Sequence, residues 1–160
     1  MPSAPAIPEA RSWQHGVRLG FAAMDAEHQG LVDAIHALRD APPEHMPAAL
    51  DSLARHVREH FAHEDAWMAE SGFPARDCHA AEHGAVLASF DGVTRRVARG
   101  ELDAARRLAD ALADWFPAHA DHLDAPLAHW LCKRQYGGTP VVLHRPPSGG
   151  PASDPRSLPC

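Results

Sequence analysis

Hydrophobic residues recur at alternating steps of three and four along four long stretches of this chain, which is the spacing of an amphipathic helix. The repeat occupies residues 21–39, 47–70, 74–99 and 101–122. These stretches are separated by Pro42 and Pro43, by Ser71 and Gly72, and by Gly100. Proline and glycine commonly end helices. We therefore predict an all-α fold in which four helices with short connections form an antiparallel up-down-up-down four-helix bundle.

The chain divides into three parts by composition. Residues 1–12 are spaced by prolines and are expected to form a flexible N-terminal arm, which continues as an extended lead-in to the first helix. The bundle is predicted over residues 13–132, and the Pro/Gly-rich residues 133–160 are expected to form a disordered C-terminal tail. A chain of 160 residues is long enough for one hydrophobic core and too short for two domains of ordinary size.

Six positions of the repeat carry polar residues where a buried apolar side chain is expected. They are His28, His60, Glu64, His79, His83 and His119. Burying a polar group without a partner costs about 2–7 kcal/mol, so six such groups must be satisfied together. His60 and Glu64 are four residues apart, as are His79 and His83, so each pair projects from one face of its helix. Ligands that converge from the walls of a helix bundle predict a metal cluster.

Asp124 follows His119 by five residues, at a point where we expect the fourth helix to end and the carboxylate to turn inward. Pro117 interrupts the same helix and is expected to kink it. With Asp124, the set holds five imidazoles and two carboxylates, which are too many donors for one ion. If both carboxylates and an oxo or hydroxo group bridge two ions, three histidines complete six-coordination at one ion, and two leave the other five-coordinate. Imidazole and carboxylate ligands suit iron, so we predict two Fe ions in a non-haem di-iron centre with one open position.

Four motifs occur in a characteristic order along residues 13–125. They are D-x-x-H at Asp25–His28, H-F-x-x-E at His60–Glu64, H-x-x-x-H at His79–His83 and H-x-x-x-x-D at His119–Asp124. In this order the motifs resemble those of the hemerythrin family, and most closely those of its single-domain bacterial members, the bacteriohemerythrins. Each motif alone would be a weak signal, but the ordered set is highly specific.

The resemblance implies a role for each ligand. His79, His83 and His119 would hold the coordinatively saturated iron, His28 and His60 would hold the iron with the open position, and Glu64 and Asp124 would bridge the two irons. It also implies reversible dioxygen binding at the open position, for storage, delivery or sensing of O2, with small anions as possible competitors. The residues expected to form an apolar pocket there are Met24, Leu31, Val32, Phe61 and Trp115.

Two other classes of function are compatible with such a bundle. One is a di-iron oxidase, ferroxidase or peroxidase, but ferritin-like enzymes use two Glu-x-x-His motifs, and no glutamate here precedes a histidine by three residues. Because histidines also outnumber carboxylates in the ligand set, we expect an O2-binding protein that is not an enzyme. The other class is a signalling module that responds to O2 or iron, for which the tail with Cys160 offers a place to contact a partner.

Composition and charge limit the possible binding partners and the cellular location. The formal net charge is −6 with no basic run, so nucleic acid is not an expected partner. Neither a membrane span nor a secretion leader is recognisable, so we expect a cytoplasmic protein, and a monomer. Three cysteines match no disulfide framework or zinc knuckle. The eight remaining histidines are expected mostly in solvent, with His56 and His63 as candidates for contacts to a ligand.

Overall fold

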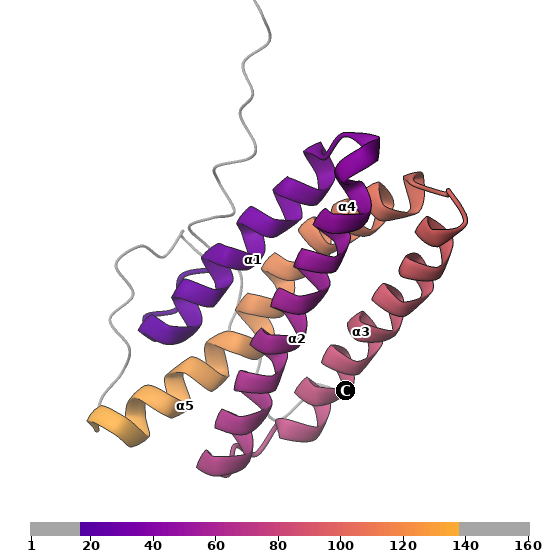
Figure 1. The fold of residues 1–160 in the computed structure, drawn as a ribbon. Coiled ribbons are helices and arrows are strands. Elements are labelled where there is room, and N and C mark those ends of the chain that lie inside the picture. The colour runs from indigo at the N-terminus through magenta and orange to yellow at the C-terminus, as the bar shows by residue number, and fades with distance from the viewer. Residues whose placement is uncertain (1–16, 138–160) are drawn as a thin grey trace, which may run out of the picture.

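The computed structural model describes residues 17–137, and within them it confirms the all-α fold class. The predicted arm and all but the first residues of the predicted tail lie outside the described residues. The long helices are α1 (Ala22–Asp40), α2 (Met46–Ser71), α3 (Arg76–Ala98), α4 (Asp103–His119) and α5 (Ala125–Tyr136), with a 3-10 turn, η2, at Pro43–His45 and a π-helical segment, η3, at Ala120–Asp124 (Figure 1). No helix of residues 17–137 is long and apolar enough to cross a membrane.

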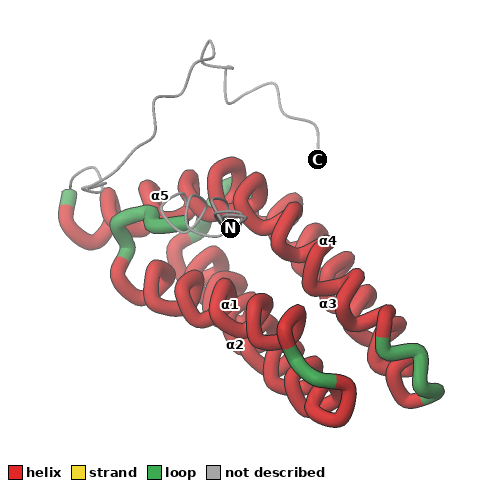
Figure 2. The backbone as a smooth tube through the Cα atoms, turned by 90° about the horizontal axis from the view of Figure 1, so that it is seen from above, coloured by secondary structure: helices red, strands yellow, loops and turns green. Residues whose placement is uncertain are grey.

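Helices that are neighbours in the chain are also neighbours in space. α1 packs against α2 and α4, and α3 packs against α2 and α4, so the four helices close a ring. Figures 1 and 2 show these helices running alongside one another, with short connections at the ends of the bundle. This is the arrangement that short loops between long helices predict.

The helix ends follow from local backbone chemistry. The prolines that follow Ala41 prevent α1 from continuing, because proline lacks an N–H and restricts the residue before it. α2 ends at Gly72, which adopts a left-handed backbone with φ of 66°, and its N–H caps the carbonyls of the last turn. Gly100, with φ of 87°, makes the reversal between α3 and α4. These ends lie within two residues of those that the sequence pattern predicts.

The prediction that the fourth helix ends near residue 122 is wrong. The helical path continues through the π-helical turn η3 into α5, which ends at Tyr136, beyond the predicted boundary of the bundle. In η3 the N–H of Ala125 bonds to the carbonyl of Ala120, five residues earlier. The extra residue in this turn shifts the hydrophobic register by one position, so the repeat that ends at His119 does not extend into α5 and gives no sign that the helix continues.

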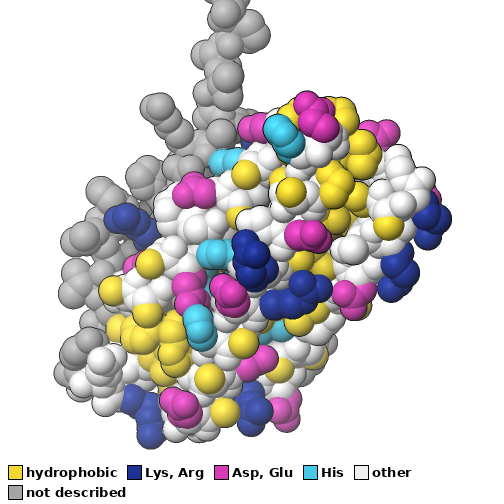
Figure 3. All heavy atoms as spheres, in the orientation of Figure 1, with side chains coloured by type: hydrophobic (Ala, Val, Ile, Leu, Met, Phe, Trp, Pro, Cys, Tyr) yellow, Lys and Arg dark blue, Asp and Glu magenta, His cyan; other side chains and the backbone are white. Residues whose placement is uncertain are grey.

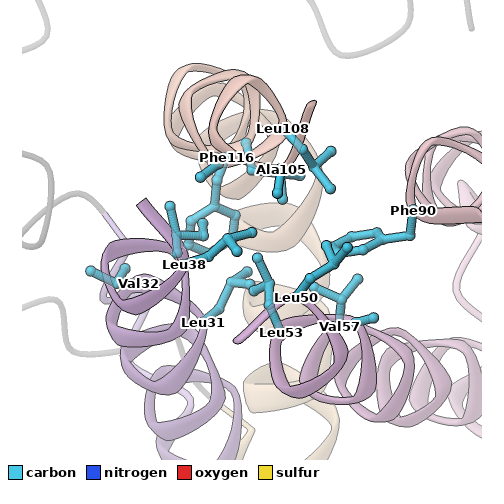
Figure 4. Packing of buried hydrophobic residues seen from close by; sticks show 14 of the residues in the cluster. Leu31, Val32, Leu38, Leu50, Leu53, Val57, Phe90, Ala105, Leu108 and Phe116 are labelled. Atoms are coloured by element: carbon cyan, nitrogen blue, oxygen red, sulfur yellow. The ribbon is translucent and has the colours of Figure 1, made fainter. Parts of the chain in front are cut away.

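Within residues 17–137 the hydrophobic core consists of two separate clusters. The larger one, seen from close by in Figure 4, includes Leu31, Leu38, Leu50, Leu53, Val57, Phe90, Ala105, Leu108 and Phe116. The smaller one consists of Leu19, Met24, Met68, Phe73, Leu127 and Ala128. On α1, His28 lies between Met24 of the smaller cluster and Leu31 of the larger one, and on α2 Glu64 lies between Phe61 and Met68 in the same way. The predicted ligands therefore form a polar layer between two apolar clusters.

Two helical glycines allow a matched test of the contact between α1 and α2. A Cβ on Gly30 would lie 2.6 Å from His56 Cε1, whereas a Cβ on Gly92 meets nothing within 4 Å. Replacing a helical glycine by alanine stabilises by about 0.5–1 kcal/mol. In Gly30→Ala the displaced His56 ring would also lose its 2.9 Å hydrogen bond to the Glu27 carbonyl, which costs about 0.5–1.5 kcal/mol. We expect Gly92→Ala to raise the free energy of unfolding of the metal-free protein in urea, and Gly30→Ala to leave it unchanged or lower it. Equal stabilisation by both substitutions would contradict this account.

Candidate metal centre

All seven predicted ligands are buried inside the bundle. None is more than 2% exposed. At least one of them comes from each of α1, α2, α3 and the α4–η3 segment. α1 provides His28, α2 provides His60 and Glu64, α3 provides His79 and His83, and the α4–η3 segment provides His119 and Asp124. The structure thus brings together the six residues that break the hydrophobic repeat and Asp124.

Glu64 lies between two groups of histidines. Its Oε1 is 3.6 Å from His60 Nε2 and 3.9 Å from His28 Nε2. Its Oε2 is 3.1 Å from His83 Nε2 and 3.4 Å from His79 Nε2. One carboxylate oxygen therefore faces each group.

Asp124 divides the histidines in the same way. Its Oδ2 is 3.2 Å from His28 Nε2, and its Oδ1 is 3.0 Å from His79 Nε2 and 3.1 Å from His119 Nε2. Both carboxylates thus span a three-histidine side, made by His79, His83 and His119, and a two-histidine side, made by His28 and His60. Two overlapping sets of potential ligands result, one on each side, and Glu64 belongs to both.

The π turn explains how Asp124 reaches the site. In an α-helix, residues five apart point about 140° away from each other, because each residue turns the helix by about 100°. The wider π turn reduces this angle, so His119 and Asp124 face the same side of one continuous helix. The inward turn of Asp124 is confirmed, although it arises from a π turn within the helix and not from a helix end. Pro117, which has no N–H to donate in the preceding turn, lies directly upstream.

The inner atoms of the site have no hydrogen-bond partner among the described residues. These atoms are the five Nε2 atoms of the histidines and the four oxygens of Glu64 and Asp124. Buried polar atoms are nearly always satisfied, so nine unsatisfied ones around one space require a common partner. Metal ions in this space would satisfy all nine atoms at once. The donor set of imidazole and carboxylate therefore fits two iron ions.

The comparisons with known proteins lead to the same kind of centre. The profile of the Hemerythrin HHE cation binding domain matches residues 19–131. A bacteriohemerythrin of Ralstonia nicotianae is 39% identical over 122 residues, which cover 76% of this chain and 89% of that protein. The chain belongs to the hemerythrin family.

More distant relatives are also hemerythrins. A bacteriohemerythrin of Stenotrophomonas maltophilia is 25% identical over 138 residues, which cover 79% of this chain and 90% of that protein. A myohemerythrin of Theromyzon tessulatum is 26% identical over 100 residues, which cover 62% of this chain and 82% of that protein. No solved structure matches the chain.

In this hemerythrin-family chain, the outer nitrogens of the two-histidine side have defined partners. His28 Nδ1 donates to the carbonyl of Val17 at 2.8 Å, and His60 Nδ1 donates to Glu27 Oε2 at 2.8 Å. When such a ring is neutral its proton is on Nδ1, so the lone pair of Nε2 faces the centre and can bind a metal ion. The lead-in segment before α1 thus takes part in orienting His28.

On the three-histidine side, two of the predicted ligands have acidic partners. His119 Nδ1 lies 3.0 Å from Glu82 Oε2, and His83 Nδ1 lies 3.3 Å from Asp65 Oδ1. His79 Nδ1 has no hydrogen-bond partner within residues 17–137. The sequence reasoning missed Glu27, Asp65 and Glu82. Each is next to a predicted ligand in the sequence, but each contacts a histidine of another helix, which only the pairing of the helices reveals.

The apolar surroundings of the two-histidine side differ in part from the prediction. Leu31, Val32 and Phe61 belong to the larger cluster. Trp115 packs against that cluster too, but its ring lies against His119 of the three-histidine side, with ring centroids 4.3 Å apart. Met24 instead packs in the smaller cluster, on the other side of the ligand layer. Phe116, which the sequence reasoning missed, packs edge-on against His28 with ring centroids 5.0 Å apart.

Opposite charges stabilise one another in the metal-free centre. Burial disfavours the protonated forms of His28 and His79, but the adjacent Asp124 and Glu64 outweigh it and raise the pKa of His28 to about 10 and that of His79 to about 9. Burial and the repulsion from Asp124 would raise the pKa of Glu64, but the histidines around it hold that pKa well below its usual range. Without metal, protons therefore occupy part of the place that cations would take.

Metal loading should release these protons. At neutral pH His28 and His79 are protonated in the metal-free protein, whereas a metal ligand must be neutral. We expect about two protons to be released per chain at pH 7, and the apparent affinity to rise with pH until about pH 9–10, where these histidines lose their protons unaided. Calorimetric titration with Zn²⁺ in two buffers of different ionisation enthalpy measures the proton count. A heat of binding that does not depend on the buffer would disprove the expectation.

Proposed function

We propose that this protein binds dioxygen reversibly at a non-haem di-iron centre held by the seven buried residues described above. The observation that carries the proposal is the division of the five histidines into three and two around a pair of shared carboxylates. His79, His83 and His119 would hold one iron, His28 and His60 would hold the other, and Glu64 and Asp124 would bridge them. Two ferrous ions would supply two electrons and, on the two-histidine side, the open position that dioxygen needs.

The surroundings of this side suit reversible binding. Phe116 packs on His28 of this side. Phe61 lies between the two sides, because it stacks on His83 with ring centroids 3.8 Å apart and is tilted against His60 at 5.6 Å. Both phenylalanines are almost fully buried. Apolar side chains exclude water and offer no acidic proton to bound oxygen. An excess of imidazole over carboxylate ligands also favours binding over oxygen activation. These features support an O2 carrier, store or sensor in preference to an oxidase.

The cellular setting remains part of the proposal. We also propose a cytoplasmic location, where a reducing environment would help to keep the irons ferrous. The net charge of −6 does not favour nucleic acid. That the protein works as a monomer, and that small anions compete with O2 for the open position, stay predictions.

Reconstitution with iron tests the proposed function directly. The metal-free protein, supplied anaerobically with Fe²⁺, is expected to hold two irons per chain. On exposure to air it should develop a visible charge-transfer absorption that disappears again under argon over repeated cycles. Fewer than two irons per chain, or an absorption that does not reverse, would refute reversible binding at a di-iron centre. Continuous consumption of O2 with added Fe²⁺ would show an oxidase instead.

A pair of histidine variants tests the assignment of the ligands. His60→Ala removes one of only two histidines on its side, so we expect one iron to be retained and the oxygen-dependent absorption to be lost. The matched control is His122→Ala, because His122 lies between His119 and Asp124 in the sequence but is exposed. It should retain two irons and the reversible absorption. Elemental analysis measures the iron content, and the visible spectrum measures the oxygen-dependent absorption. Equal loss of iron and of absorption in both variants would contradict the ligand assignment.

A further inference from the structure

Glu27 on α1 accepts hydrogen bonds from two histidines of α2. His60 Nδ1 donates to Glu27 Oε2 at 2.8 Å, and His63 Nδ1 donates to Glu27 Oε1 at 2.5 Å. His63 is 58% exposed and the Glu27 side chain is 22% exposed, so the carboxylate lies between the buried ligand and the surface. Over α1 and α2, Figure 3 shows histidine side chains beside acidic ones at the surface.

The backbone of Glu27 is held as well. His56 Nε2 lies 2.9 Å from the Glu27 carbonyl oxygen, and the absence of a side chain on Gly30 makes room for the His56 ring. Both the backbone and the carboxylate of Glu27 are therefore attached to α2. The carboxylate has little freedom to move away from His60.

The other acidic residues that contact ligands are held less firmly. Glu82, which accepts from His119, is 51% exposed, and Asp65, which accepts from His83, is 45% exposed. Neither has a second imidazole among its hydrogen-bond partners in residues 17–137. On the two-histidine side, His28 donates to the neutral Val17 carbonyl. Among the described residues, Glu27 is thus the one carboxylate that contacts the outer edge of this side.

We propose that Glu27, held in place by His63, is a positioning residue for the iron on the two-histidine side and acts on it through His60. The inference rests on the proposed function, because it assumes that His60 is a ligand. A carboxylate on Nδ1–H fixes the tautomer and the ring orientation of a ligand histidine and makes its Nε2 a stronger donor. Metal affinity on the two-histidine side depends strongly on each of its two nitrogen donors. The hydrogen bond between Glu27 and His60 should therefore affect metal binding on this side most.

Binding of Co²⁺ to the metal-free protein tests the proposal without any oxygen chemistry. Removing such an outer partner typically lowers metal affinity about 10–100-fold. In Glu27→Ala we expect one Co²⁺ to be held as in the unmodified protein and the other to be held about 10–100-fold more weakly. Glu27→Gln keeps an oxygen that can accept the hydrogen bond and should restore most of the affinity. His63→Ala, at an exposed position, should cause a smaller loss of the same ion and keeps the test open if Glu27→Ala does not fold.

A double-variant comparison shows whether Glu27 acts through His60. In His60→Ala only the ion of the three-histidine side should remain. Adding Glu27→Ala to it should not weaken that ion further, whereas adding Glu82→Ala should, since Glu82 acts through His119. Equilibrium dialysis followed by metal analysis measures each affinity, and circular dichroism verifies the fold.

Two results would overturn the inference. One is Co²⁺ affinities in Glu27→Ala and His63→Ala that both equal those of the unmodified protein. The other is a further loss of the remaining ion when Glu27→Ala is added to His60→Ala. Failure of the unmodified protein to bind two ions would be a different result, because it would refute the proposed di-iron centre itself.

Discussion

Nine buried donor atoms that face one another across a small space are the constraint on which the rest of this structure depends. Such atoms are costly to leave unsatisfied inside a protein, so positive charge has to complete the set, as metal ions or, without metal, as protons on His28 and His79. The registers of four helices, the outer hydrogen bonds of four ligand histidines and the π turn all serve to direct these atoms inward. The apolar residues above and below the layer keep water out of it and hold the helices together.

Much of the fold and of the centre could be predicted because burial imposes a period on the sequence. His60, Glu64, His79 and His83 occupy positions where that period requires an apolar residue, so the spacing of residues alone was enough to deduce their burial. The helix ends at Gly72 and Gly100 were equally readable, because glycine there relieves a left-handed backbone. The hydrophobic repeat within one helix is thus sufficient to predict which polar residues project from its core face.

What the sequence did not reveal depends on more than one helix or on an irregular turn. The π turn at Ala120–Asp124 adds one residue to the helix, which breaks the period that would have shown its continuation to Tyr136. Glu27 and Glu82 lie beside predicted ligands in the sequence, yet their hydrogen bonds are with His60 and His119, which are 33 and 37 positions away. Contacts of this kind require knowing which helices pack together and at what height.

The distribution of the ligands along the chain has a consequence for the order of assembly. His60 with Glu64, and His79 with His83, come together as soon as a single helix has formed, because each pair is one turn apart. His28 and Asp124, in contrast, are almost a hundred residues apart in the sequence, yet their side chains lie 3.2 Å from each other. The pairs His60–Glu64 and His79–His83 can therefore form early in folding, whereas the complete set of seven residues forms only after the segment that carries Asp124 has packed against α1. A complete metal site is thus possible only in the fully folded chain.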